Sequence, residues 1–240
     1  MVDIKLQYIA NIFVEKNDIL PNAKHIPYFL QEFEDRGFVP TIFKQENNGQ
    51  VRNNLQLNSP NSEWIIRFWE NRIDIVKSRQ SDEGIGDFSY FCDDIVDIWQ
   101  KINKQYQKKA NRLGITTTTL FNEISEKKLK EIYGKMFLPI PVQELSNPVS
   151  WENEIISTVP KLVLDKEELI NIGIGMKRVQ GNFLERDNLV DFDGIEMAVH
   201  INTISDNSTY RFTNDAIVNF FNSTKNWHTD LVTKIKNHLL

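Results

Sequence analysis

The sequence predicts an α+β protein in which largely antiparallel sheets pack against long helices, in two related halves. Segments of alternating apolar and polar residues follow one another as meanders, and helices do not separate single strands. A long helical segment closes each meander, at about 87–108 and from Asn214 onward. A proline-rich stretch at 139–148 separates the halves. We therefore expect one unit over residues 1–140 and a second over residues 149–240.

The first unit begins with an alternating strand and continues with a helix that Pro27 favours at its first turn and Gly37 ends. The clearest hairpin follows, because Trp64, Ile66 and Phe68 alternate before a Glu70-Asn71 turn. The helix at 87–108 carries an apolar stripe spaced by four, three, four and four residues. Strands are expected at 4–14, 51–57, 63–69, 72–79 and 112–121, and helices at 26–36, 87–108 and 125–137.

The second unit reads as an antiparallel sheet followed by a long helix. Residues 154–164 and 169–179 form a pair that turns at Asp165-Lys166-Glu167, and Gly194 precedes a third strand over 195–204. Asn214 is placed to cap the last helix. Because both units end a meander with a long helix, the pattern is consistent with a duplicated unit.

The most regular polar feature is a basic stripe on the first long helix. Three lysines spaced by three and four residues share one helix face, and no acid lies between 100 and 112. The stripe predicts either a contact for phosphate or for an acidic protein, or a solvated face near a helix C-terminus. Its members are Lys101, Lys104, Lys108, Lys109 and Arg112.

The hairpin offers a second candidate surface. If Trp64, Ile66 and Phe68 face the core, Trp69 is left on the other side of the sheet. A tryptophan there beside Arg67 would be typical of a protein interface, unless a second helix layer covers that face. Nearby Arg72, Lys77 and Arg79 extend the basic patch, and Glu63, Glu70 and Asp74 dilute it.

Acidic and histidine side chains supply the alternative site. Asp191 and Asp193 form a D-x-D with Glu196 close by, which fits either a magnesium or proton-sharing site or an ordinary charged turn. Among the histidines, His200 and His228 are the pair that packing of the last helix on the sheet could bring together. Gly173-Ile174-Gly175 does not complete a dinucleotide fingerprint, because position 178 is Arg.

No pattern in the sequence names a cofactor or a metal, and we predict neither. Cys92 is the only cysteine, so no disulfide within the chain and no cysteine-based zinc site can form. No signal peptide is recognised at the start of the sequence, and no apolar run reaches the roughly 18 residues of a membrane helix. These features favour a cytoplasmic location without a membrane. A net charge of −5 gives no general drive toward nucleic acid.

Several segments resemble a sporadically distributed family of uncharacterised bacterial α+β proteins. They are Ile65-Ile66-Arg67-Phe68, the helix that ends near Tyr106, Ala110-Asn111-Arg112-Leu113-Gly114-Ile115, and the region around Asp206 and Trp227-His228. The resemblance implies an α+β fold of two related halves and transfers no catalytic residue. Families of this distribution often travel with mobile or antiviral defence genes.

We therefore expect a non-enzymatic binding or accessory protein that acts through protein–protein contacts, with a protein partner or a second copy of itself, in a bacterial defence or toxin-type system. One alternative is a phosphate-directed enzyme or nucleic-acid-handling protein that uses the basic stripe with Asp191, Asp193 and Glu196. This alternative requires those carboxylates to converge near Lys104 and Lys108. Another is a small-molecule sensor with an apolar pocket between the last helix and the C-terminal sheet.

Overall fold

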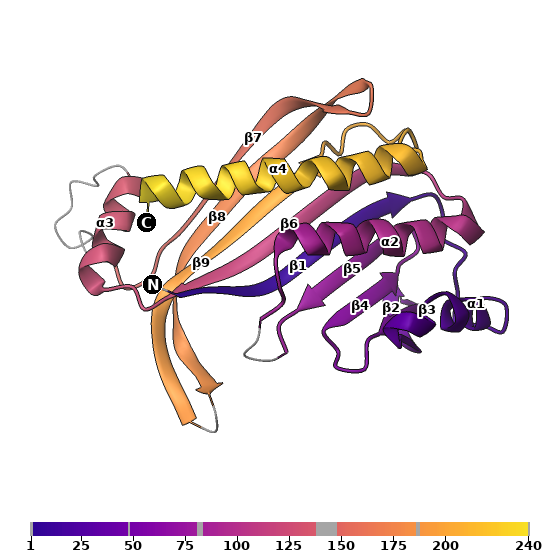
Figure 1. The fold of residues 1–240 in the computed structure, drawn as a ribbon, viewed down its shortest axis with the longest axis horizontal. Coiled ribbons are helices and arrows are strands. Elements are labelled where there is room, and N and C mark those ends of the chain that lie inside the picture. Colours follow the sequence, from indigo (N-terminus) through magenta and orange to yellow (C-terminus); the bar gives the residue numbers. More distant parts are fainter. Residues whose placement is uncertain (1, 48, 81–83, 138–147, 186–187, 240) are drawn as a thin grey trace.

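Over the residues that it describes, the computed structural model contains a nine-stranded antiparallel sheet and four α-helices, which confirms the predicted α+β class (Figure 1). It describes residues 2–47, 49–80, 84–137, 148–185 and 188–239. The strands are β1 (Val2–Val14), β2 (Val39–Asn47), β3 (Gln50–Asn58), β4 (Trp64–Phe68), β5 (Arg72–Ser78), β6 (Ala110–Asn122), β7 (Glu152–Val163), β8 (Lys166–Glu185) and β9 (Asn188–Thr203). The helices are α1 (Ile26–Glu32), α2 (Phe88–Tyr106), α3 (Glu126–Met136) and α4 (Asn214–Leu239), and a 3-10 turn, η1 (Glu34–Arg36), follows α1.

One sheet runs through the whole described chain in the order β2-β3-β4-β5-β1-β6-β9-β8-β7. Strands β1 and β6 pair at its centre, and β6 also pairs with β9 over Gly114–Phe121. Strands of the two predicted units, 1–140 and 149–240, therefore belong to the same sheet. Of the prolines expected to separate the units, Pro139 and Pro141 lie outside the described residues.

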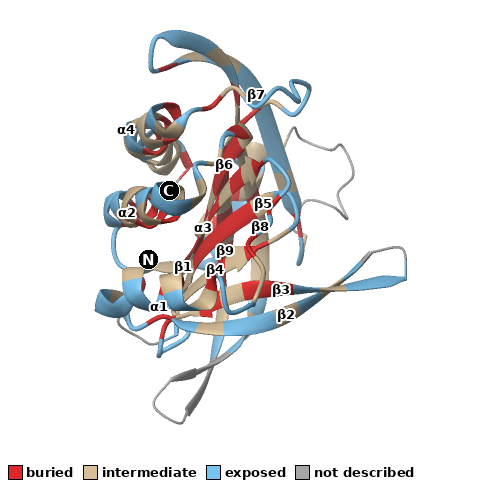
Figure 2. Ribbon diagram, turned by 90° about the vertical axis from the view of Figure 1, so that its right-hand side faces the viewer, coloured by how far each residue is buried: buried red, intermediate tan, exposed pale blue. Residues whose placement is uncertain are grey.

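Helices α1, α2 and α4 lie on one side of this sheet, here called the helix face (Figure 2). The opposite side is called the open face, because no helix of the described ranges covers it. Side chains alternate between the two faces along each strand. Thr117 and Thr119 of β6 are 2% and 4% exposed on the helix face, whereas their neighbours Thr116 and Thr118 are half-buried on the open face.

The core lies between the helix face and the two long helices. The predicted stripe of α2 is buried from Phe91 to Ile102 and half-buried at Tyr106, and Trp99 beside it is fully buried. The Trp99 indole Nε1 donates a hydrogen bond to Asn214 Oδ1, 3.1 Å away at the start of α4, so the two helices are joined by a polar contact as well as by packing. Phe220 and Phe221 of α4 are also fully buried.

The observed elements differ from the predicted ones in three ways. Strands β8 and β9 are longer than the predicted 169–179 and 195–204, and Gly194, expected to precede a strand, lies inside β9. Strand β2 was not predicted, because Pro40 and the polar residues after Phe43 weaken its pattern. The helix predicted over 26–36 is divided into α1 and η1, and Gly37 ends it with a left-handed φ of 61° as expected. Ser125 caps α3 by accepting a hydrogen bond from the Lys128 backbone N–H at 3.3 Å, although no capping box is present.

Both edges of the sheet carry a proline where the backbone faces away from the neighbouring strand. On β7 the Arg178 N–H donates to the Trp151 carbonyl, so odd-numbered residues point their backbone groups at β8 and Pro160 points outward. On β2 the pairing of Asn47 with Gln50, which closes the hairpin with β3, places Pro40 in the same outward set. A proline there removes an N–H that another strand could use, which hinders edge-to-edge association.

Gly194 is a position where the fold depends on a missing side chain. A Cβ atom built on Gly194 would lie 2.3 Å from the Phe121 carbonyl oxygen on β6. We therefore expect Gly194→Ala to lower the free energy of unfolding by about 2 kcal/mol, because β6 and β9 would have to separate locally. Gly175→Ala is the matched control, since a Cβ atom at Gly175 meets nothing within 4 Å. Urea unfolding of both variants checks this, and equal stability of the two would contradict it.

Candidate functional site

The open face carries a cluster of arginine and aromatic side chains at the end of the sheet where β4 turns into β5. Trp69 follows β4 and lies on this face as predicted, and its backbone N–H donates to the Arg72 carbonyl at 2.8 Å. The Trp69 ring meets the Phe43 ring of β2 edge-on, with centroids 4.7 Å apart. Phe43 therefore connects the edge of the sheet to the turn that the sequence analysis singled out.

A buried carboxylate holds this cluster in place. Asp74 is 5% exposed and accepts a hydrogen bond from Trp69 Nε1 at 2.5 Å on one oxygen and from Asn11 Nδ2 at 2.6 Å on the other. The Arg72 guanidinium also pairs with Asp74, at 2.7 and 3.0 Å. Asp74 was expected only to dilute a basic patch, but its contacts show that it orients the aromatic and basic side chains around it.

Phe13 of β1 lies between two arginines because β1 is flanked by β5 and β6. Its register partners are Arg72 on β5 and Arg112 on β6. The two guanidinium carbons lie 5.6 and 5.1 Å from the Phe13 ring centroid, which is the geometry of cation–π contacts. Arg112 also donates from Nη2 to the neutral Asn202 amide at 3.2 Å, and its buried Nε has no partner among the described residues.

Arg67 extends the cluster along β4. Its Nε donates to the Gln56 side-chain oxygen at 2.9 Å. Within the described ranges neither Arg67 nor Arg112 has a carboxylate partner, in contrast to Arg72. We call this surface the Arg–aromatic cluster, and its members are Phe13, Phe43, Arg67, Trp69, Arg72 and Arg112.

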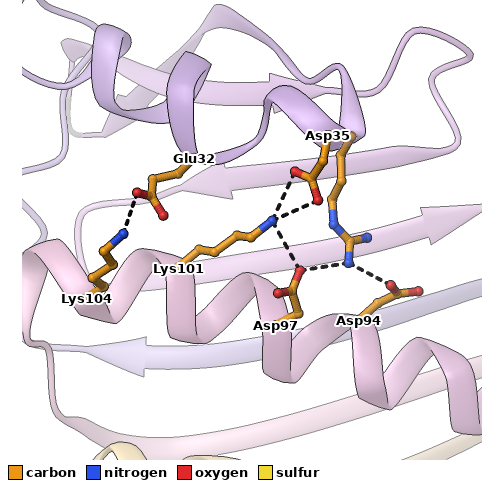
Figure 3. A network of polar contacts seen from close by, with 7 residues as sticks. Glu32, Asp35, Asp94, Asp97, Lys101 and Lys104 are labelled. Carbon is orange, nitrogen blue, oxygen red and sulfur yellow. Dashed lines mark hydrogen bonds and ion pairs between the residues drawn. The ribbon is translucent and has the colours of Figure 1, made fainter.

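Three lysines of the predicted basic stripe on α2 are paired with carboxylates of the same chain, whereas a free phosphate site would leave its lysines without such partners. Lys101 contacts both Asp35 oxygens at 3.0 Å, and Lys104 contacts Glu32 at 2.7 Å (Figure 3). Lys108 contacts Asp18 at 2.8 Å. All three lysines therefore face acidic residues of α1, η1 and the segment before α1.

These contacts attach the N-terminal helical segment to α2. Arg36 of η1 adds to them by donating to Asp94 and Asp97 at 2.8 and 2.9 Å (Figure 3). The hydrogen bond from Lys108 lowers the pKa of Asp18, and the hydrogen bond from Lys101 lowers the pKa of Asp35. Lys109 lies outside this arrangement and is exposed. Arg112 belongs to the open face, so the predicted stripe divides between two sides of the molecule.

The acidic residues predicted for the alternative site do not converge on the lysines. Asp191 and Asp193 lie on the β8–β9 hairpin, which projects from the sheet far from the C-terminal end of α2 (Figure 1). Arg178 pairs with Asp193 at 2.5 Å and lowers its pKa, while Lys177 pairs with Glu196 at 2.8 Å. Because residues 177 and 178 point to opposite faces, Asp193 and Glu196 do as well.

The expectation that His200 and His228 meet was wrong. His200 of β9 lies on the open face, 3.1 Å from Thr116 Oγ1, and His228 of α4 lies on the helix face, 2.9 Å from Thr117 Oγ1. Adjacent threonines of β6 therefore contact the two histidines from opposite sides of the sheet. Burial lowers the pKa of His228 to about 4, and its ring stacks on Phe88 with centroids 4.0 Å apart.

Two members of this surface were not identified from the sequence, namely Phe13 and Phe43. Alternation places Phe13 opposite the apolar residues Ile12 and Val14, and that signal alone could have assigned it to the open face. Phe43 could not be placed, because its strand was not predicted. Pairing across strands far apart in the sequence is what brings these rings to the arginines.

Comparison with known proteins assigns no family, because neither a protein-family model nor a curated protein matches the chain. Within the described ranges, no three His, Cys, Asp or Glu side chains are arranged to hold a metal ion. The same residues contain no helix with the length and apolar character needed to cross a membrane. The fold and the Arg–aromatic cluster are therefore the basis for assigning a function.

Proposed function

We propose that this chain is a non-enzymatic binding protein that holds an acidic surface of a partner protein against the open face of its sheet. The observation that carries the proposal is that two arginines of the Arg–aromatic cluster have no carboxylate partner among the described residues. Arg67 and Arg112 hold full positive charges beside neutral amides, on a surface that also presents Phe13 and Trp69. Arginine and tryptophan are the residues that most often dominate the energy of protein interfaces.

The arrangement is preorganised for binding. Asp74 fixes the Trp69 indole and the Arg72 guanidinium, and Phe13 holds Arg72 and Arg112 at either side. Rigid side chains lose little conformational entropy when a partner binds, which improves affinity. Carboxylates of a partner would pair with Arg67 and Arg112, and its apolar groups would cover the aromatic rings. The chain as a whole is acidic, with a net charge of −5, so the basic patch is a local feature. Charge complementarity at this patch would favour an acidic surface of a partner.

The test compares capture of a partner by three forms of the tagged protein in its natural host. Arg67→Gln with Arg112→Gln removes the two charges and leaves the Asp74 contacts intact. Lys104→Gln is the matched control, because Lys104 is an exposed cation on the other face. We expect the wild type and the control to recover one stoichiometric protein, and the double variant to bind that purified protein at least tenfold more weakly.

The same experiment contains the results that would contradict the proposal. A partner that binds the double variant with wild-type affinity would place the interface elsewhere on the molecule. Recovery of the wild type with nucleic acid, lost after nuclease treatment, would favour the nucleic-acid alternative, which relied on lysines that face Glu32, Asp35 and Asp18. Size-exclusion chromatography of the purified wild type distinguishes a second copy from a different protein.

We also propose that the two halves of the sheet descend from one repeated unit. The order of elements supports this, because β1, α1, a meander of strands and α2 are followed by β6, α3, a second meander and α4. In each half the first strand pairs with the last strand of the meander, β1 with β5 and β6 with β9. Superposing the Cα atoms of β1, β5 and α2 on those of β6, β9 and α4 tests the proposal. A failure to overlay in one rigid rotation would contradict it.

A further inference from the structure

A second candidate site lies on the helix face, separated by the sheet from the Arg–aromatic cluster. A pocket of about 250 Å³ opens between the start of α2, the C-terminal half of α4 and the central strands β1 and β6. Its lining includes two lysines, several hydroxyl groups and the rings of Tyr8 and Phe88. The volume is sufficient for a small metabolite, and the mixture of apolar walls and a few polar groups is typical of ligand pockets.

The strongest sign of a ligand is a hydroxyl group in the pocket lining that has no partner among the described residues. Thr119 of β6 lines the pocket and is 4% exposed, yet its side chain makes no hydrogen bond to any described residue. Its neighbour on the same face, Thr117, has a partner in His228 at 2.9 Å. The Thr119 hydroxyl therefore remains able to donate to and accept from a molecule in the pocket.

The two lysines of the lining indicate the chemistry of that ligand. Lys5 of β1 and Lys236 of α4 both contact the single carboxylate of Asp3, Lys5 at 2.7 Å. Their side chains remain 30% and 33% exposed. One carboxylate therefore pairs with two ammonium groups at the pocket, and Asp87, the one acid of the lining, balances the second lysine charge. Each ammonium carries three N–H donors, and the contacts with Asp3 use only some of them, so N–H donors remain for acceptor oxygens of a ligand.

We propose that this pocket binds a small molecule through a phosphate group held by Lys5, Lys236 and the Thr119 hydroxyl. Phosphate offers several strong acceptor oxygens, which suits two ammonium groups and the hydroxyls of Thr229 and Thr233 better than a single carboxylate does. The Phe88 ring and Tyr8 supply an apolar wall for the remainder of the molecule. The site is independent of the proposed partner-binding function, because it lies on the other face of the sheet.

Calorimetric titration of the full chain tests the proposal with inorganic phosphate, glycerol 3-phosphate and acetate as probes. Thr119→Val removes the hydroxyl while conserving shape, and we expect it to weaken phosphate binding about tenfold. Lys236→Met is expected to weaken it at least as much. The matched control is Thr118→Val, one residue along β6 on the open face, which should bind phosphate as the wild type does. Thermal unfolding of each variant confirms that it folds.

The outcomes separate the alternatives. Tighter binding of glycerol 3-phosphate than of inorganic phosphate would identify a phosphorylated metabolite, and the reverse would identify free phosphate. Acetate binding as tight as phosphate binding would overturn the assignment of a phosphate group. Equal effects of Thr119→Val and Thr118→Val, or no binding of either phosphate probe to the wild type, would overturn the site.

Discussion

Replacing Asp74 with alanine is expected to lower the free energy of unfolding by about 3–5 kcal/mol, because it removes the acceptor at the centre of the Arg–aromatic cluster. The carboxylate is buried and takes hydrogen bonds from Trp69 and Asn11 and an ion pair from Arg72. Removing it leaves two side-chain donors and a guanidinium without their partner. Buried groups that lose their partner cost more than the net energy of the bond itself.

Denaturant unfolding followed by circular dichroism measures this effect. Asp74→Asn is the companion variant, because it conserves the shape and one acceptor oxygen while removing the charge. We expect it to lie between the wild type and Asp74→Ala. Trp69 fluorescence should shift in Asp74→Ala, since the indole N–H loses its acceptor. A destabilisation of less than about 1 kcal/mol in Asp74→Ala would show that Asp74 does not organise the cluster.

The second large effect is a loss of stability as the pH is lowered, and its source is the buried imidazole of His228. Burial lowers the pKa of this imidazole from 6.5 to about 4, and the charges of Lys5 and Lys236 act in the same direction. Between pH 6.5 and about pH 4, His228 is therefore protonated in the unfolded chain and neutral in the folded chain. Stability is present above pH 6.5 and falls as the pH drops through that window, by about 3 kcal/mol in total.

The measurement is the free energy of unfolding between pH 7 and pH 4 for the wild type and for His228→Gln, which retains a polar side chain toward Thr117 but does not titrate. The difference between the two curves isolates His228, because the pKa of His25 is also lowered and contributes to both. We expect the variant to lose markedly less stability over this range. Parallel curves would contradict the assignment.

Local patterns predicted most of the fold. Alternation located β4 and β5 and their turn, and the stripe of α2 predicted a helix that buries Ile95 and Ile102. These features are encoded by residues two to four positions apart, which is the range that periodicity covers. Strand β2 was missed because its stability depends on pairing with β3 and on rings such as Phe43 that pack on distant residues.

The candidate sites were predictable only in part. Alternation correctly placed Trp69 on the face opposite Trp64, Ile66 and Phe68, and Arg67 shares that face. The sequence allowed two interpretations of the lysine stripe, a ligand contact or a solvated face. It could not decide between them, because the partners Asp18, Glu32 and Asp35 lie 66 to 90 positions away in the chain. Nothing in a local pattern shows whether a cation meets a distant carboxylate or remains available to a ligand.

The sequence by itself determined the α+β class, the faces of most strands and the absence of any disulfide within a chain that has only Cys92. Only the tertiary structure decided that β1 and β6 pair, that Phe13 lies between Arg72 and Arg112, and that the hydroxyl of Thr119 opens into a pocket beside Lys5 and Lys236. The physical reason is the distance along the sequence between the residues that interact. Secondary structure follows from the spacing of neighbouring residues, whereas a binding site requires groups from distant strands and helices to meet.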